Sequence, residues 1–138
     1  MASELKVDKF TGVTTAGSIL VTGEGGSTTT NLQQGLGKFW INFNGTGTIA
    51  ARDSFNFTSL TDNGTGDYSI TIANNMNNAN YANAGSSGGQ ASTSNGSSYA
   101  YDQATARTSS LYRILTPNTS GTSVDTPIIE NHIMGDLA

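Results

Sequence analysis

The residues that could perform acid–base or metal chemistry gather near the end of the sequence. His132 is the only histidine in the 138-residue chain, and Glu130, Asn131 and Asp136 lie within a few positions of it. A histidine beside carboxylates can act as a general base or as a metal ligand. A zinc site normally needs a second imidazole or a thiolate, and the chain contains no cysteine. We therefore expect His132 to be a surface or structural residue, and we expect no metal and no cofactor.

Two other patterns are superficially similar to ligand sites. The segment 62–67, DNGTGD, is similar to a calcium loop but lacks the regular carboxylate spacing and the terminal glutamate of the helical-hand type. We expect a hairpin turn there, with weak Ca²⁺ binding as the alternative. The glycine clusters at 23–26 and 85–89 are not followed by the Lys-Ser/Thr pair of a phosphate-binding loop, and no serine lies in a G-x-S-x-G pattern. The sequence offers no catalytic residues, so we expect the protein not to be an enzyme.

Aromatic side chains are the remaining candidates for a binding site. Six of them could form a platform on which sugar rings stack, namely Trp40, Phe39, Phe43, Phe55, Phe57 and Tyr68. Their regular alternation along the chain favours core filling instead. Tyr99 and Tyr101 stand in a polar segment, where an aromatic ring is better placed to contact a partner than to enter a core, so both are candidate outward contacts. Tyr81 and Tyr112 fit either role.

The composition indicates a chain rich in strands and turns. Thr (20), Gly (17), Ser (16) and Asn (14) account for 67 of the 138 residues, and these types form helices poorly and turns readily. The net charge is −4 with six basic residues, which argues against nucleic acid and anionic membrane surfaces as partners. No apolar run approaches the length of about 18 residues that indicates a membrane span. The opening MASELKVDKF lacks the apolar core of a signal peptide, so we expect synthesis in a cytoplasm.

Residues 1–37 are sparsely apolar and interrupted by glycines, a pattern that predicts an extended arm. Short strands are expected at Leu5–Thr11 and Ser18–Thr22, where apolar residues alternate or cluster. Such a segment cannot bury its apolar side chains alone, so it is either a flexible tail or an anchor that orders against sister subunits or a larger body. We favour the anchor. Its candidate contacts are Leu5, Val7, Phe10, Ile19, Leu20 and Val21.

Residues 38–138 predict an antiparallel β domain. Strands with period-two alternation are expected at Lys38–Asn44, Ser54–Thr61, Asp67–Ile72, Ser109–Leu115 and Ile128–Met134. The expected core comprises Phe39, Ile41, Phe43, Phe55, Phe57, Tyr68, Ile70 and Ile72. Residues 82–106 are mostly small residues and are expected to form a long Gly/Ser/Asn-rich loop. The predicted fold class is all-β, a small antiparallel sandwich or barrel, jelly-roll-like, that gains further burial by assembling as a trimer.

The stretch 38–81 resembles a domain of small virion proteins of marine and cyanobacterial tailed phages. The resemblance rests on WINFNGTG at 40–47, RDSFN at 52–56 and DNGTGDY at 62–68. The opening SELKVDKFTGVTTAGSILVTGEG and the closing GDLA are similar to the ends of such proteins, so that little beyond residues 82–106 lies outside the resemblance. Glu130 and His132 stand where a more apolar strand is expected, which leaves open how deeply that strand is buried.

The resemblance implies a non-enzymatic structural protein of the bacteriophage virion, assembled in the host cytoplasm, of tail-fibre-like or surface-decoration type. Its partners would be two further copies in a homotrimer and other structural proteins of the capsid or tail, with a host-surface glycan as an additional ligand. Binding of nucleic acid and insertion into a membrane are not expected. Head and tail positions stay open. A stand-alone carbohydrate-binding module that recognises sugars through Trp40 or the tyrosines stays open as well.

Overall fold

The computed structural model describes residues 4–13, 15, 19–23, 25–89, 101–102 and 107–138, and at 101 and 102 it describes the backbone alone. The chain divides into two compact units, 1–36 and 37–138. Antiparallel strand pairs occur in both units, and strands dominate the unit of residues 37–138, so the expectation of an all-β chain is confirmed. Within the described ranges no helix is long and apolar enough to cross a membrane.

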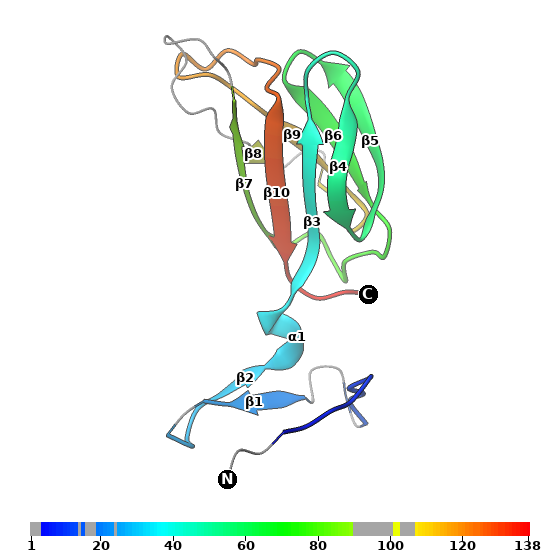
Figure 1. Cartoon of the computed structure of the whole chain (residues 1–138), viewed down its shortest axis with the longest axis vertical. Helices are drawn as coiled ribbons and strands as arrows, with labels where there is room; N and C mark the ends of the chain where they lie inside the picture. The colour runs from blue at the N-terminus through cyan, green and yellow to red at the C-terminus, as the bar shows by residue number, and fades with distance from the viewer. Residues whose placement is uncertain (1–3, 14, 16–18, 24, 90–100, 103–106) are drawn as a thin grey trace. The chain divides into compact units, whose positions relative to one another are not determined.

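The unit formed by residues 1–36 contains a small hairpin and one helical turn (Figure 1). β1 (Leu20–Thr22) and β2 (Thr29–Asn31) pair antiparallel, and α1 (Leu32–Gly35) follows β2 directly. β1 falls within the strand expected at Ser18–Thr22, of which residue 18 lies outside the described residues. The expected strand Leu5–Thr11 does not form in this described segment, because an extended stretch without a pairing partner gains no ladder hydrogen bonds.

In the unit formed by residues 37–138, the described residues form two four-stranded antiparallel sheets (Figure 1). The first sheet runs β4 (Ala50–Phe55), β3 (Gly37–Asn44), β10 (Ile128–Met134) and β7 (Ala82–Gly88). The second sheet runs β5 (Phe57–Gly64), β6 (Asp67–Ile72), β9 (Leu111–Leu115) and β8 (Tyr101–Asp102). β3 pairs with β4 and β5 with β6 within one sheet, whereas the chain passes to the other sheet from β4 to β5, β6 to β7, β7 to β8 and β9 to β10.

The core lies between the two sheets, where alternate side chains from both inner faces meet. Its buried apolar residues are Phe39, Ile41, Phe43, Tyr68, Ile70, Ile72, Met76, Tyr81, Tyr112, Ile114, Ile129 and Ile133. Two edge-to-face aromatic pairs cross from sheet to sheet: Phe39 with Tyr112 at 5.5 Å between ring centroids, and Phe43 with Tyr68 at 5.2 Å. The core prediction is confirmed for all its residues except Phe55 and Phe57, and the two ambiguous tyrosines 81 and 112 are core residues.

Phe55 and Phe57 differ from the prediction because the strand expected at Ser54–Thr61 is broken at Asn56. Asn56 has a φ of 60°, a left-handed conformation that asparagine tolerates better than most residues. Its side chain makes two hydrogen bonds to the backbone of Asn74. Asn56 Nδ2 donates to the Asn74 carbonyl oxygen at 3.1 Å, and Asn56 Oδ1 accepts from the Asn74 N–H at 2.7 Å. The chain passes from the first sheet to the second at this residue. Phe55 is consequently 53% exposed at the end of β4, and Phe57 is only partly buried.

Part of the expected loop at 82–106 is a strand. Residues 82–88 form β7, which pairs with β10 along its whole length, from Ile128 opposite Gly88 to Met134 opposite Ala82. Strand pairing requires only backbone N–H and C=O groups and a partner strand. The small side chains of β7 are therefore tolerated, because β10 beside it supplies the apolar surface. The loop prediction was therefore wrong for this part. Residues 90–100 and 103–106 lie outside the described residues.

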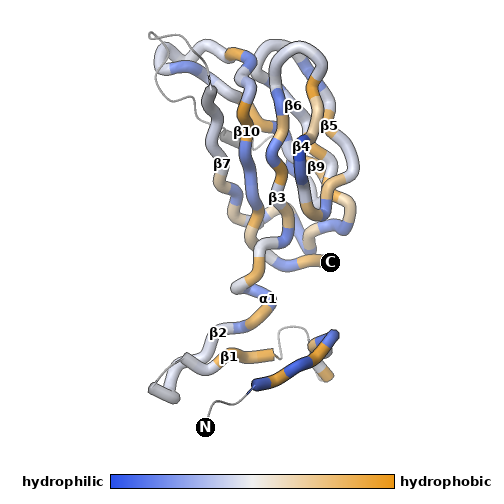
Figure 2. Tube along the Cα trace, in the orientation of Figure 1, coloured by the Kyte–Doolittle hydropathy of each residue, from blue (hydrophilic) through white to orange (hydrophobic). Residues whose placement is uncertain are grey.

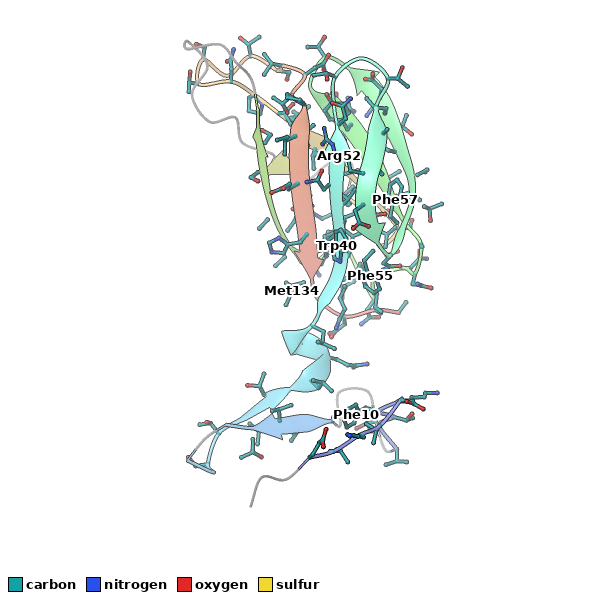
Figure 3. The ribbon with its side chains drawn as sticks, viewed as in Figure 1. Phe10, Trp40, Arg52, Phe55, Phe57 and Met134 are labelled. Atoms are coloured by element: carbon teal, nitrogen blue, oxygen red, sulfur yellow. The ribbon has the colours of Figure 1, made fainter. Side chains whose placement is uncertain are left out.

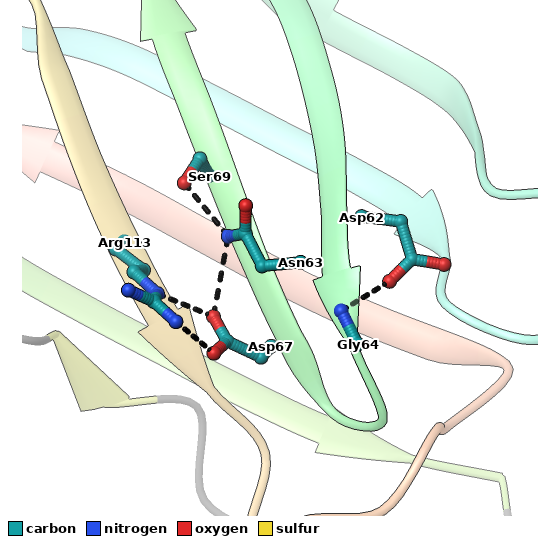
Figure 4. Close-up of polar contacts among 6 residues, drawn as sticks. All are labelled: Asp62, Asn63, Gly64, Asp67, Ser69 and Arg113. Atoms are coloured by element: carbon teal, nitrogen blue, oxygen red, sulfur yellow. Dashed lines mark hydrogen bonds and ion pairs between the residues drawn. The ribbon is translucent and has the colours of Figure 1, made fainter.

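The turn expected at DNGTGD is confirmed and joins β5 to β6 (Figure 4). Asp62 accepts the backbone N–H two residues further on at 2.9 Å. Asp67 accepts a hydrogen bond from Asn63 at 3.3 Å and forms an ion pair with Arg113 on β9. Hydrogen bonding to the Arg113 guanidinium lowers the pKa of Asp67 below its ordinary value. Both carboxylates of the turn are therefore engaged in holding the hairpin and attaching it to β9.

Candidate functional site

Strand β10 places Glu130 and His132 on the outer face of the first sheet. The alternation of the strand sends Ile129 and Ile133 into the core, where neither has any exposed surface. Glu130 and His132 are exposed. The inner side of β10 is thus fully buried. Glu130 and His132, which interrupt the apolar pattern expected for this strand, both lie on its outer side.

The register of the first sheet arranges the outer side chains in two parallel rows. The first row contains Phe55, Trp40, His132 and Ala84, which are direct cross-strand partners from β4, β3, β10 and β7. The second row contains Asp53, Asn42, Glu130 and Ser86, from the same strands in the same order. Because the rows are two residues apart along each strand, roughly 6.6 Å separates them. An aromatic row and a polar row thus lie side by side on one sheet face.

Hydrogen bonds connect the polar row across the sheet. Asn42 Nδ2 donates to Glu130 Oε1 at 2.9 Å, and Ser86 Oγ donates to the other carboxylate oxygen, Oε2, at 3.4 Å. Arg52 Nη1 donates to Asn42 Oδ1 at 3.1 Å. These contacts hold side chains from four strands in one orientation before any ligand arrives, which lowers the entropy lost on binding.

Arg52 reaches this row because of a β-bulge. Asn42 pairs with Asp53 but the next residue of β3 pairs with Ala51, so Arg52 is an extra residue in β4. A bulge changes the direction in which a side chain points. Here the Arg52 guanidinium extends across the sheet face to Asn42, and its Nη2 donates to the carbonyl oxygen of Pro127 at 2.5 Å. The sequence contains no signal for this bulge, and Arg52 is a site residue that sequence analysis missed.

The residues of the two rows other than Phe55 line an open groove of about 790 Å³. Its walls include Trp40, Arg52 and His132, and its β7 side is formed by Ala84, Gly85 and Ser86. The small side chains on β7 leave room above the sheet, while the long ones on β3 and β4 rise beside it. Figure 3 shows Trp40 and Phe55 side by side on neighbouring strands, with Arg52 further along β4. Trp40 is 41% exposed, so it does not belong to the core with which it was grouped.

The groove offers hydrogen-bonding groups of both kinds but little charge. The charged residues that line the groove are Asp53, Glu130 and Arg52, which gives the groove a net charge of −1 when the histidine is neutral. Asp53 uses one carboxylate oxygen on the backbone N–H of Ser54 at 2.8 Å. Among the described residues, no three His, Cys, Asp or Glu side chains gather as a metal site would require. The arrangement suits binding of an uncharged ligand through an aromatic face and hydrogen bonds.

None of the other predicted site residues is among the described residues that line this groove. In the unit of residues 1–36, the candidate anchor residues Leu5, Val7, Phe10, Leu20 and Val21 are 48–73% exposed, and Ile19 is half-buried. Figure 2 shows β1 in the colour of hydrophobic residues. Tyr99 lies outside the described residues, and of Tyr101 the structure describes the backbone in β8.

Comparison with known proteins returns no relative. The chain matches no family model, no curated protein and no solved structure.

Proposed function

We propose that the protein is a non-enzymatic structural component of a bacteriophage virion, a trimeric appendage of fibre-like type. In this proposal residues 1–36 attach the chain to the particle, and the β-sandwich of residues 37–138 is displayed on its surface. The resemblance of the 38–81 segment to phage virion proteins supports the proposal, and so does a specific feature of the N-terminal unit.

The observation that carries the proposal is the exposure of apolar side chains in residues 1–36. Five candidate anchor residues retain about half or more of their surface in water, with Leu5 at 73% and Phe10 at 60%. Each fully buried side chain of this size contributes about 1.5–3 kcal/mol, so covering several of them by a partner is strongly favourable. Among the described residues no strand pairs with the outer edges of the β1–β2 hairpin, and such an edge can accept a strand from a partner by backbone hydrogen bonding.

The sandwich fits the displayed role. It has its own core, drawn from both sheets, and so it does not need residues 1–36 for folding. Tyr99 and Tyr101 remain the proposed outward contacts to a host surface. The homotrimer is part of the proposal because sister arms would supply the apolar contacts that one arm lacks. Localisation to the virion follows from the same proposal.

Attachment is tested by deleting residues 2–30 and purifying particles from infected host cells. We expect the shortened protein to keep a folded sandwich, measured by circular dichroism, and to disappear from purified particles, measured by quantitative mass spectrometry. Light scattering of the full chain should give the mass of a trimer, and the deletion should give a monomer. A deletion variant that still decorates particles at the normal level contradicts the anchor assignment.

Two alternatives are separated by the same experiment. A capsid decoration or cement protein would be present in tens to hundreds of copies per particle, whereas a tail appendage would be present in a handful. A stand-alone carbohydrate-binding module would be absent from purified particles altogether. Copy number, counted against the major capsid protein, therefore decides between the three.

A further inference from the structure

The outer face of the first sheet carries an exposed aromatic surface that its fold does not explain. Trp40 and Phe55 are direct partners on β3 and β4, and 41% and 53% of their respective surfaces remain in water. Neither ring belongs to the core cluster. The row continues over His132 to Ala84, whose methyl group leaves the space above β7 open. A flat ligand could lie along this row in contact with the indole face.

The neighbouring row, roughly 6.6 Å from the aromatic row, supplies polar groups that hydrogen bonds hold in place. A carboxylate offers about four acceptor sites, and Glu130 uses one for Asn42 and one for Ser86. Asn42 retains a second amide hydrogen besides the one it donates to Glu130. Within the described part of the chain, the second carboxylate oxygen of Asp53 and the ring nitrogens of His132 have no hydrogen-bond partner. The ligand would therefore meet acceptors and donors in alternation along one edge.

These observations together select the class of ligand. A molecule with one apolar ring face and a rim of vicinal hydroxyl groups fits the aromatic row with its face and the polar row with its edge. We infer that the groove on the outer face of β4-β3-β10-β7 binds a neutral carbohydrate, which stacks on Trp40 and hydrogen-bonds to Asn42 and Glu130. The inference goes beyond the proposed function, since attachment to a particle requires no such site.

Charge argues against two other occupants. The groove has a net charge of −1, and its one guanidinium already donates to Asn42 and to a backbone carbonyl, so anionic sugars such as uronates or sialic acids would be repelled. A second copy of this chain would bury Arg52, Asp53 and Glu130 in the centre of an interface, where charged residues are depleted because their desolvation is costly. A hydroxyl-rich ligand instead replaces the water that these groups bind.

The test uses the single tryptophan of the chain as the reporter. The full-length protein is titrated with cellohexaose, mannohexaose and N-acetylchitohexaose, and with alginate hexamer and oligomeric sialic acid as acidic probes, up to about 10 mM to cover weak affinities. We expect a saturable blue shift of tryptophan emission with at least one neutral probe, because the sugar displaces water from the indole. Calorimetry with the same probe gives the Kd.

Four variants, compared by calorimetry because two of them lack the tryptophan, locate the site on this face. Trp40→Ala and Asn42→Ala should each weaken binding about tenfold or more, since about 1.4 kcal/mol corresponds to a factor of ten. Trp40→Phe keeps a ring face and should bind within about threefold of the natural chain. Ile128→Ala is the matched control, because it removes a side chain of similar exposure, 43%, from the same sheet but outside the groove, and it should leave the Kd unchanged. Circular dichroism confirms that each variant is folded.

Several results would overturn the inference. The ligand class is wrong if none of the neutral probes shifts the emission, or if the acidic probes bind more tightly. The location is wrong if Trp40→Ala binds as well as the natural chain. An emission that shifts with protein concentration, and with no sugar, would make the face an interface between copies. None of these results depends on particle attachment, so the inference and the proposed function fail separately.

Discussion

The hydroxyl group of Tyr68, on β6 of the second sheet, donates to the carbonyl oxygen of Gly45, which follows β3 of the first sheet, at 2.7 Å. Tyr68 has no exposed surface, and its hydroxyl also lies 3.0 Å from Oδ1 of Asp125. The backbone N–H of Gly45 donates in turn to the carbonyl oxygen of Thr126 at 3.0 Å. One buried tyrosine thus ties the two sheets and the segment before β10 together at one end of the sandwich.

Tyr68→Phe should lower the free energy of unfolding by about 1–3 kcal/mol, because it leaves the buried Gly45 carbonyl without the hydroxyl that satisfies it. Urea denaturation is the measurement, and the midpoint should fall while the m-value stays the same. An unchanged midpoint would show that water replaces the hydroxyl at no cost.

The same variant bears on stability at high pH. The pKa of Tyr68 is raised above its ordinary value of 10.0. Burial of the hydroxyl is the larger cause, and the hydrogen bond with Asp125 is the second. A raised pKa in the folded state means that the stabilisation is complete below about pH 10 and is lost as the pH rises beyond it. The natural chain should therefore lose stability above pH 10 more steeply than Tyr68→Phe, as measured by denaturation midpoints at pH 8 to 11.

Gly45 is required for space. A Cβ atom at this position would lie 2.6 Å from Ile129 Cδ1, 2.6 Å from Tyr68 Oη and 2.9 Å from the Thr126 carbonyl oxygen. Gly45→Ala should therefore cost about 1–3 kcal/mol through overpacking. Gly88→Ala is the control, since nothing lies within 4 Å of a Cβ there, and its midpoint of thermal unfolding should be unchanged or slightly higher. Equal losses in both variants would contradict the steric explanation.

Two phenylalanines distinguish the core from the outer face. Phe43→Ala should cost about 3–5 kcal/mol, because this ring has no exposed surface and packs edge-to-face on Tyr68. Phe55→Ala should cost less than about 1 kcal/mol, because its ring is half in water on the outer face. Chemical denaturation of both variants measures the difference. Similar losses would show that Phe55 is covered in solution, as it would be in an assembly through this face.

The sequence predicts the inner face of this sandwich well, because period-two alternation is a local property of each strand. Phe39, Ile41 and Phe43 occupy the core as their spacing indicates. The break at Asn56 could not be predicted in the same way: it depends on Asn74, 18 residues further on, which the Asn56 side chain binds. β7 was missed for a related reason, since its small residues carry no alternation and its strand state comes from pairing with β10.

The sequence predicts on which face of its own strand each groove residue lies, but not which strands lie side by side. Trp40 and Asn42 stand on one side of their strand, and Glu130 and His132 on one side of theirs, by alternation alone. Nothing local indicates that β3 and β10, almost 90 residues apart, pair so that Asn42 faces Glu130. Register between distant strands is fixed by the packing of the whole core, and Arg52 enters through a bulge that changes register within one pair. The sequence shows which side chains are available, but only the fold shows that they lie in one groove.

The ion pair between Asp67 and Arg113 predicts how stability depends on acid. Asp67, at the start of β6, has a side chain 16% exposed, and the guanidinium of Arg113 on β9 donates to its carboxylate from Nε at 2.6 Å and from Nη2. Hydrogen bonding to Arg113 lowers the pKa of Asp67 below its ordinary value of 3.8 although desolvation opposes the shift. A lowered pKa in the folded state means that the stabilisation is complete above the unfolded value and is lost as the pH falls through the folded value.

Denaturation midpoints measured from pH 7 to pH 2 should therefore fall more steeply below about pH 4 for the natural chain than for Asp67→Asn, which carries no titrating group at this position. At pH 7 Asp67→Asn should be the less stable of the two, and the difference should shrink as the pH falls. Asp53→Asn is the matched control: this carboxylate accepts a backbone N–H from Ser54 but has no ion pair in the described structure, so the variant should keep the steep acid dependence of the natural chain. A constant difference between the natural chain and Asp67→Asn at every pH would show that the Arg113 contact does not depend on the charge of Asp67.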